Sequence, residues 1–163
     1  MSFVNLVLSV LVIGAVFFIL GQRTATAHHS ASTIKLHSRP HYHGLWVAIT
    51  STLPALLVLL VIGLGKDLLF QHWVSDFFPP QVAGGDAVDR AIALAKISNV
   101  VDGIIFGEVE PWVQSAGEAW IRWESDAIVV ANILVLGASL TGGLLGYRRI
   151  SFKFRARNHV EKI

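Results

Sequence analysis

The sequence predicts an all-α membrane protein with three transmembrane helices and a helical segment outside the membrane between the second and third. Two observations lead to this fold class. Only 15% of the 163 residues are charged and 53% are hydrophobic, whereas a soluble domain is about a quarter charged. The apolar residues also gather in three blocks without Asp, Glu, Lys or Arg, at 1–22, 44–65 and 127–147. Each block has the length of about 20 residues that a helix needs to cross a bilayer.

The first block, 1–22, has two interpretations. Ala25-Thr26-Ala27 fits the small-residue cleavage site of a secretory signal peptide. However, Met1–Asn5 carries no positive charge, and the apolar run Val4–Leu20 is long for the hydrophobic part of a signal peptide. We therefore expect a retained transmembrane helix, with cleavage as the alternative.

The second block, 44–65, contains a proline. In a soluble protein Pro54 would argue against an unbroken helix. Within a membrane, proline is tolerated because neighbouring helices and hydroxyl groups satisfy the carbonyl that it frees. Thr50, Ser51 and Thr52 lie just before it. We expect a continuous span with a mild kink near Thr50.

The third block, 127–147, has small residues at four-residue spacing. Ala138, Gly142 and Gly146 fall on one helix face, where a partner helix can approach closely. They are the helix-packing candidates of this chain. The alternative is a glycine-rich segment that is merely flexible.

The distribution of charge predicts the orientation. Residues 23–43 have three Lys or Arg and no acid, and residues 148–163 have six and one acid. Residues 66–126 have four Lys or Arg against ten Asp or Glu. Because basic loops stay inside, we expect a cytoplasmic loop at 23–43, a basic cytoplasmic linker at 148–163, and a periplasmic N-terminus. The basic tail is expected to contact the lipid bilayer; no feature indicates a nucleic-acid partner.

The segment 66–126 is too long for a plain loop, so we expect a periplasmic helical cap. Its first part, Leu68–Phe78, resembles an interfacial helix anchored by Trp73. Pro79-Pro80 is expected to stop that helix. A substrate-binding domain is the alternative interpretation of the whole segment.

Two further helices are predicted in the cap. Asp86 is a suitable N-cap for a helix over about 87–104, which Gly107 ends. Pro111 suits the first turn of a helix that carries three tryptophans into the last span.

The residues carry no recognisable catalytic chemistry. His41 and His43, with His37 nearby, do not have the spacing of a shared metal site, so a polar loop is the simpler interpretation. Glu108 and Glu110 could form a carboxylate pair, but a solvated acidic surface is the simpler alternative. No P-loop or hydrolase motif is present. We expect no enzyme activity and no catalytic, cofactor-binding or metal-binding residues.

Two stretches carry a family resemblance. They are LHSRPHYHGLWVA at 36–48, continued by LPALL at 53–57, and the basic end FRARNHVEKI at 154–163. Together they resemble the N-terminal region of the permease subunit of proteobacterial high-affinity phosphate (Pst-type) ABC transporters. The family-motif residues are His37, Ser38, Pro40, Tyr42, Gly44 and Pro54.

This resemblance implies phosphate import across the bacterial inner membrane. The implied partners are another permease subunit, cytoplasmic ATPase subunits and a periplasmic phosphate-binding protein. The core permease domain of the family has no counterpart here, so no transport residue is carried over. The resemblance implies that a further span follows the linker, which makes the chain a fragment of a longer permease or the product of a split gene.

Three functions compete at this point. The first is an N-terminal membrane region that supports assembly of a phosphate permease. The second is a stand-alone membrane scaffold or sensor-like protein with an extracytoplasmic helical cap. The third, a membrane-embedded enzyme, lacks any catalytic constellation to support it.

Overall fold

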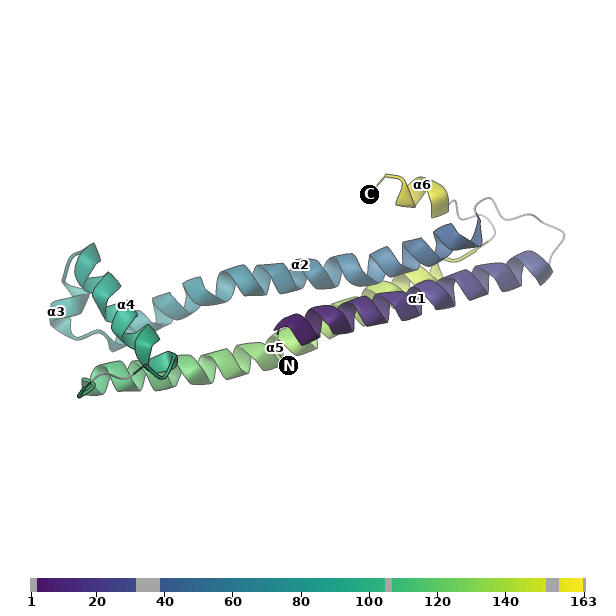
Figure 1. Cartoon of the computed structure of the whole chain (residues 1–163). Helices are drawn as coiled ribbons and strands as arrows, with labels where there is room; N and C mark the ends of the chain where they lie inside the picture. Colours follow the sequence, from purple (N-terminus) through teal and green to yellow (C-terminus); the bar gives the residue numbers. More distant parts are fainter. Residues whose placement is uncertain (1–2, 32–38, 105–106, 152–155, 163) are drawn as a thin grey trace. The chain divides into compact units, whose positions relative to one another are not determined.

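The computed structural model describes residues 3–31, 39–104, 107–151 and 156–162, and every regular element within them is a helix (Figure 1). The long helices are α1 (Phe3–Ala31), α2 (Pro40–Val74) and α5 (Pro111–Arg148). The short ones are η1 (Ser75–Phe77), α3 (Pro80–Ala83), α4 (Ala87–Val101) and α6 (Ala156–Val160).

Each long helix contains a stretch apolar enough to cross a membrane. These stretches lie within Val4–Ala27, Pro40–Phe77 and Pro111–Arg148. Only 22% of each apolar window is buried by the rest of the chain, so most of its surface is available to lipid or to other membrane segments. The predicted fold class, an all-α membrane protein with three spanning helices, is confirmed.

The chain divides into two compact units. The first comprises Met1–Val61 with Ala131–Ile163, and the second comprises Ile62–Val130. We call them the span unit and the cap unit. With 35 and 38 residues, α2 and α5 are longer than a bilayer requires, and the ends of both helices belong to the cap unit.

Each long helix turns one regular stripe of residues toward its neighbours in the span unit. The α2 stripe has four-residue spacing, as residues on one helix face must. It consists of His43, Val47, Ser51, Ala55 and Leu59. The α1 stripe is Leu6, Val10, Gly14, Gly21 and Ala25, and the α5 stripe is Ala131, Val135, Ser139, Gly143 and Gly146.

Two helices extend beyond the uncharged blocks. Helix α1 continues past Gln22 to Ala31, and Ala25 of the candidate cleavage sequence is buried in it beside Val47 and Ile150. Helix α2 passes through Gly65 to Val74, so the predicted interfacial helix is the end of α2 followed by η1. The uncharged blocks therefore mark the apolar part of each helix and not its ends.

The cap unit has its own hydrophobic core. Val74 at the end of α2, Ile97 of α4, and Val113 and Ala116 of α5 are buried together. Phe77, Phe78, Leu94, Val100, Val101, Val109, Trp112, Trp120 and Trp123 pack around them. This core comes from three elements far apart in sequence, so the segment is a packed helical subdomain.

Helix α4 begins as predicted. The Asp86 carboxylate accepts hydrogen bonds from the backbone N–H groups of Val88 (2.8 Å) and Asp89 (2.9 Å). The Asp89 side chain in turn accepts from the backbone N–H of Asp86, which completes a capping box. The helix ends at Val101, before Gly103 adopts a positive φ of 73°. Pro79-Pro80 does not only stop a helix, because Pro80 also starts the short α3.

Aromatic rings join α2 and α5 within the cap unit. Phe70 lies edge-on to Trp120, with ring centroids 5.6 Å apart, and Trp73 lies edge-on to Trp123 at 5.5 Å. Lys66 forms an ion pair with Glu124 at 3.3 Å. The predicted anchor Trp73 is therefore part of a helix contact, and 42% of it remains exposed.

Candidate functional site: the helix-packing face and the cap pocket

A buried serine pair joins α2 to α5. The Ser51 hydroxyl donates to the Ser139 backbone carbonyl at 3.0 Å and lies 3.1 Å from the Ser139 hydroxyl. Both residues are fully buried. A polar bond between helices is retained in a membrane because lipid offers no alternative partner to either group.

Two of the predicted packing glycines lie against Thr50. A Cβ atom at Gly142 would collide with the Thr50 carbonyl oxygen, and one at Gly146 would collide with the Thr50 hydroxyl. Substitution at Gly142 therefore forces the two backbones apart, whereas substitution at Gly146 requires at least the Thr50 side chain to move. Ala138, the third candidate, is half-buried, and Ser139 beside it makes the contact with α2.

Pro54 explains why a backbone carbonyl is present at this interface. A proline has no N–H group, so the carbonyl four residues earlier loses its helical donor. That carbonyl belongs to Thr50, and it is the group that faces Gly142. Contacts between Cα–H groups and carbonyl oxygens are common at close helix crossings, and a glycine allows such an approach.

The hydroxyl groups before Pro54 bond to other acceptors. The Thr50 hydroxyl donates to the carbonyls of Trp46 and Val47, both at 3.0 Å, and the Thr52 hydroxyl donates to Ala48 at 3.0 Å. Ser51 bonds across to Ser139. None of these three hydroxyls bonds to the Thr50 carbonyl that Pro54 frees, contrary to the prediction. That carbonyl instead faces Gly142 of α5.

Helix α1 packs on the other two by the same means. A Cβ at Gly143 of α5 would strike the Phe17 ring, and one at Gly14 of α1 would strike the Thr52 methyl group. The Thr24 and Tyr147 hydroxyls lie 2.9 Å apart. Glycine and hydroxyl residues thus bring all three helices of the span unit together.

The family-motif residues lie at the start of α2. Pro40 opens the helix, and the Gly44 Cα packs so close to α1 that a Cβ would lie 2.8 Å from the Phe18 carbonyl oxygen. His41 stacks edge-on against Phe18 at 5.6 Å and against Tyr42 at 5.9 Å. His37 and Ser38 lie outside the described residues.

The structure describes two of the three histidines that were considered as metal ligands, and both lie on helix α2. His43 is fully buried in the α2 stripe, whereas His41 is exposed on the neighbouring face of α2. Both belong to the first turns of a helix and not to a loop. Within the described ranges, no three His, Cys, Asp or Glu side chains lie close enough together to hold a metal ion.

Sequence reasoning missed part of this face. Ser139 and Gly143 are buried on α5, one position beyond the predicted Ala138 and Gly142. A four-residue spacing fits either register, and the sequence of one helix does not show which register the partner selects. The pairing of Ser51 with Ser139 carries no signal in a single sequence.

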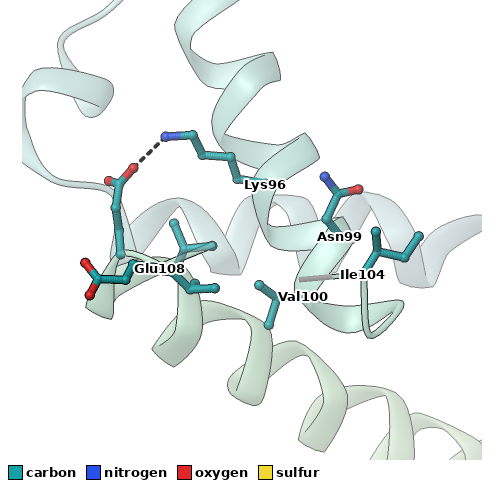
Figure 2. Close-up of a pocket in the computed structure, with 8 residues that line it drawn as sticks. Lys96, Asn99, Val100, Ile104 and Glu108 are labelled. Atoms are coloured by element: carbon teal, nitrogen blue, oxygen red, sulfur yellow. Dashed lines mark hydrogen bonds and ion pairs between the residues drawn. The ribbon is translucent and has the colours of Figure 1, made fainter. Parts of the chain in front are cut away.

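The cap unit contains a small open pocket, which the sequence did not suggest. It has a volume of about 220 Å³ and lies between α4 and the start of α5 (Figure 2). Its lining residues are Lys96, Asn99, Val100, Ile104, Glu108, Val109, Glu110 and Val113. One side is polar and the other aliphatic.

Glu110, one of the two acidic residues of this pocket, has two close hydrogen-bond donors. The Glu110 carboxylate accepts from the Lys96 ammonium at 2.6 Å, the dashed line in Figure 2, and from the Trp112 indole N–H at 2.6 Å. These two hydrogen bonds lower the pKa of Glu110 below its ordinary value, and the bond from Lys96 has the larger effect. Glu110 is thus held as an anion, which does not suit a general acid.

Comparison with known proteins identifies a family for this chain. Residues 7–163 fit the family model DUF3708, described as "Phosphate ATP-binding cassette transporter". Neither a curated protein nor a solved structure matches the chain. The matched residues include most of α1, all of α2 and α5, the cap unit and the serine–glycine packing face. This chain is a multi-pass membrane protein that belongs to the phosphate ATP-binding cassette transporter family.

Proposed function

We propose that this chain is the N-terminal membrane region of a phosphate ABC transporter permease, and that it supports assembly of the permease for ATP-driven phosphate import. The observation that carries the proposal is the family match over residues 7–163 of a chain with three membrane-spanning helices. An ATP-binding cassette transporter combines membrane subunits with soluble ATPase subunits. Three apolar helices favour a place among the membrane subunits.

The packing of the span unit supports a structural role. Two hydroxyl pairs join its own helices, Ser51 with Ser139 and Thr24 with Tyr147. Its outward faces are rich in exposed aliphatic side chains, such as Val12 on α1 and Leu57 on α2. A helix bundle of this kind contributes surface to a membrane assembly, and it carries out no catalytic step itself in our proposal.

The proposed partners are another permease subunit, the cytoplasmic ATPase subunits and a periplasmic phosphate-binding protein. The basic residues of 23–43 and 148–163 support a cytoplasmic location for those segments in the proposed topology, on the side of the membrane where the ATPase subunits act. The acidic cap then lies in the periplasm of a bacterial inner-membrane protein.

Removal of residues 1–147 from the transporter tests the proposed role. We expect the remaining permease to yield less purified complex with the ATPase subunits, and phosphate uptake by cells to fall. If assembly and uptake were both unchanged, the proposed role would be wrong, and a stand-alone scaffold would be the better interpretation.

A pair of glycine variants makes this test sharper. Gly142→Leu drives a side chain into the Thr50 carbonyl, whereas a Cβ at Gly137 on the same helix meets no atom within 4 Å, so Gly137→Leu is the control. We expect Gly142→Leu to lower co-purification of the ATPase subunits and Gly137→Leu to leave it unchanged. The amount of each variant in the membrane is measured first, so that loss of insertion is separated from loss of assembly.

Cysteine labelling tests the proposed orientation, because the chain contains no cysteine. Single cysteines replace Ser32, Ser115 and Ser151, and an impermeant thiol reagent is added to intact cells. We expect labelling at position 115 alone. Labelling at position 32 as well would mean that the first helix is cleaved or reversed.

A further inference from the structure

An apolar groove runs along the span unit between α2 and α5. It has a volume of about 330 Å³ and is open along one side. Its walls are the side chains of Trp46, Ile49, Leu53, Pro54 and Leu145, and its floor is formed where Thr50 meets Gly142 and Gly146. The groove exists because the glycines supply no side chains to fill it.

One end of this groove is positively charged. Arg149, the residue that follows α5, lines the groove beside Trp46. It has no ion pair among the side chains that the structure describes. The groove therefore has an aliphatic body, an indole ring and a guanidinium group at the end where the helix leaves the membrane.

The charge of the whole span unit has the same sign. The residues of this unit, 1–61 and 131–163, include nine Lys or Arg and a single acid, Glu161. Glu161 is bonded to Arg157 at 2.7 Å. No carboxylate among the described residues of the unit is therefore left to neutralise Arg149, and an anionic group from outside the chain is its natural partner.

We propose that this groove binds one anionic phospholipid, with an acyl chain along Leu53, Pro54 and Leu145 and the headgroup phosphate on Arg149. Basic pockets between transmembrane helices are suited to anionic lipid headgroups, and aromatic rings such as Trp46 lie preferentially at headgroup level. A partner helix could also occupy an apolar groove, but an anion at its end is not a general property of such a helix, whereas every anionic phospholipid supplies one. The charge of this end favours the lipid.

Two arginine variants test the headgroup contact. The 163-residue chain is purified in detergent, and binding of phosphatidylglycerol and phosphatidylcholine is measured by native mass spectrometry. We expect preference for phosphatidylglycerol, and Arg149→Gln should weaken that binding about fivefold, as loss of one cation near a headgroup implies. Arg148→Gln is the matched control, because Arg148 is exposed and does not line the groove.

Two leucine variants test the acyl-chain contact. Leu53→Trp fills the groove, whereas Leu57→Trp places the same ring one turn away, outside it; the two leucines are 57% and 63% exposed, so both variants should fold. Only Leu53→Trp should reduce phosphatidylglycerol binding. Equal loss in Arg149→Gln and Arg148→Gln, or no effect of Leu53→Trp, would overturn the proposal. So would crosslinking of residue 53 to a partner helix in cells in place of lipid.

Discussion

The Ser51 hydroxyl lies within hydrogen-bonding distance of both the carbonyl and the hydroxyl of Ser139, a residue 88 positions later in the chain. This pair links the middle of the second span to the third in a region where both side chains are fully buried. Because a serine hydroxyl could equally bond to its own helix, the cross-helix bond indicates that the two backbones are close.

Replacement of Ser51 by alanine should destabilise the packed helices. It leaves the Ser139 groups without their partner, and bonds between membrane helices contribute about 0.6 kcal/mol on average. The free energy of unfolding in micelles is the quantity to measure. Ser9→Ala is the control, because the Ser9 hydroxyl is exposed and bonds to the Asn5 carbonyl of its own helix at 2.8 Å. Equal effects of the two variants would contradict an interhelical role.

Removal of the cap on α4 should loosen the cap unit. Asp86→Ala removes the acceptor for the N–H groups of Val88 and Asp89, and loss of such a cap costs about 1 kcal/mol. We expect faster hydrogen exchange at the first amides of α4. Asp86→Asn should exchange almost as slowly as the unaltered chain, because asparagine caps nearly as well as aspartate.

Acid should weaken the contact between α4 and the start of α5. Lys96 and Trp112 lower the pKa of Glu110 only when the cap unit is folded. The contact therefore adds stability above the ordinary carboxyl pKa near 4.5, and this contribution disappears as the pH falls through the lower folded value. The fluorescence of the five tryptophans between pH 6 and pH 3, at about one-unit intervals, follows the change.

Glu110→Gln should remove most of this pH response. Glu118→Gln is the matched control, since Glu118 accepts a hydrogen bond from the Gln114 side chain one turn earlier on the same helix, at 3.1 Å. A pH response that survives Glu110→Gln would assign it to another carboxylate.

The cap should not bind inorganic phosphate. Residues 66–126 carry ten acids against four bases, and such a surface repels an anion at low salt. Calorimetric titration of phosphate into the whole chain should give no binding at about micromolar concentrations. Affinity in that range, lost on substitution of Lys96, would instead identify the pocket of Figure 2 as a phosphate site.

The sequence predicted those features that depend on local chemistry. Three spans follow from uncharged blocks, and the start of α4 follows from Asp86 because a side chain two or three residues away is enough to cap a helix. Gly142 and Gly146 lie on a packing face because small residues at this spacing share one side of a helix.

Features that depend on a distant partner could not be predicted. The burial of Ser139 and Gly143 is set by which face of α5 meets α1 and α2. Helix α2 continues past Gly65 because Phe70 and Val74 are buried in the cap unit. The pocket beside Lys96 forms only when α4 packs on α5. Each requires the tertiary structure.

The position of Thr50 between Gly142 and Gly146 also has a mechanical consequence. The Thr50 carbonyl packs on Gly142, and the Thr50 hydroxyl packs on Gly146 one helical turn later. A slide of α5 along α2 by a single residue would replace a glycine at this point with a side chain. The two helices can separate, but they cannot slip past each other in small steps. Within the span unit the two helices therefore form a rigid pair, whose axial register is fixed by the absence of two β-carbons.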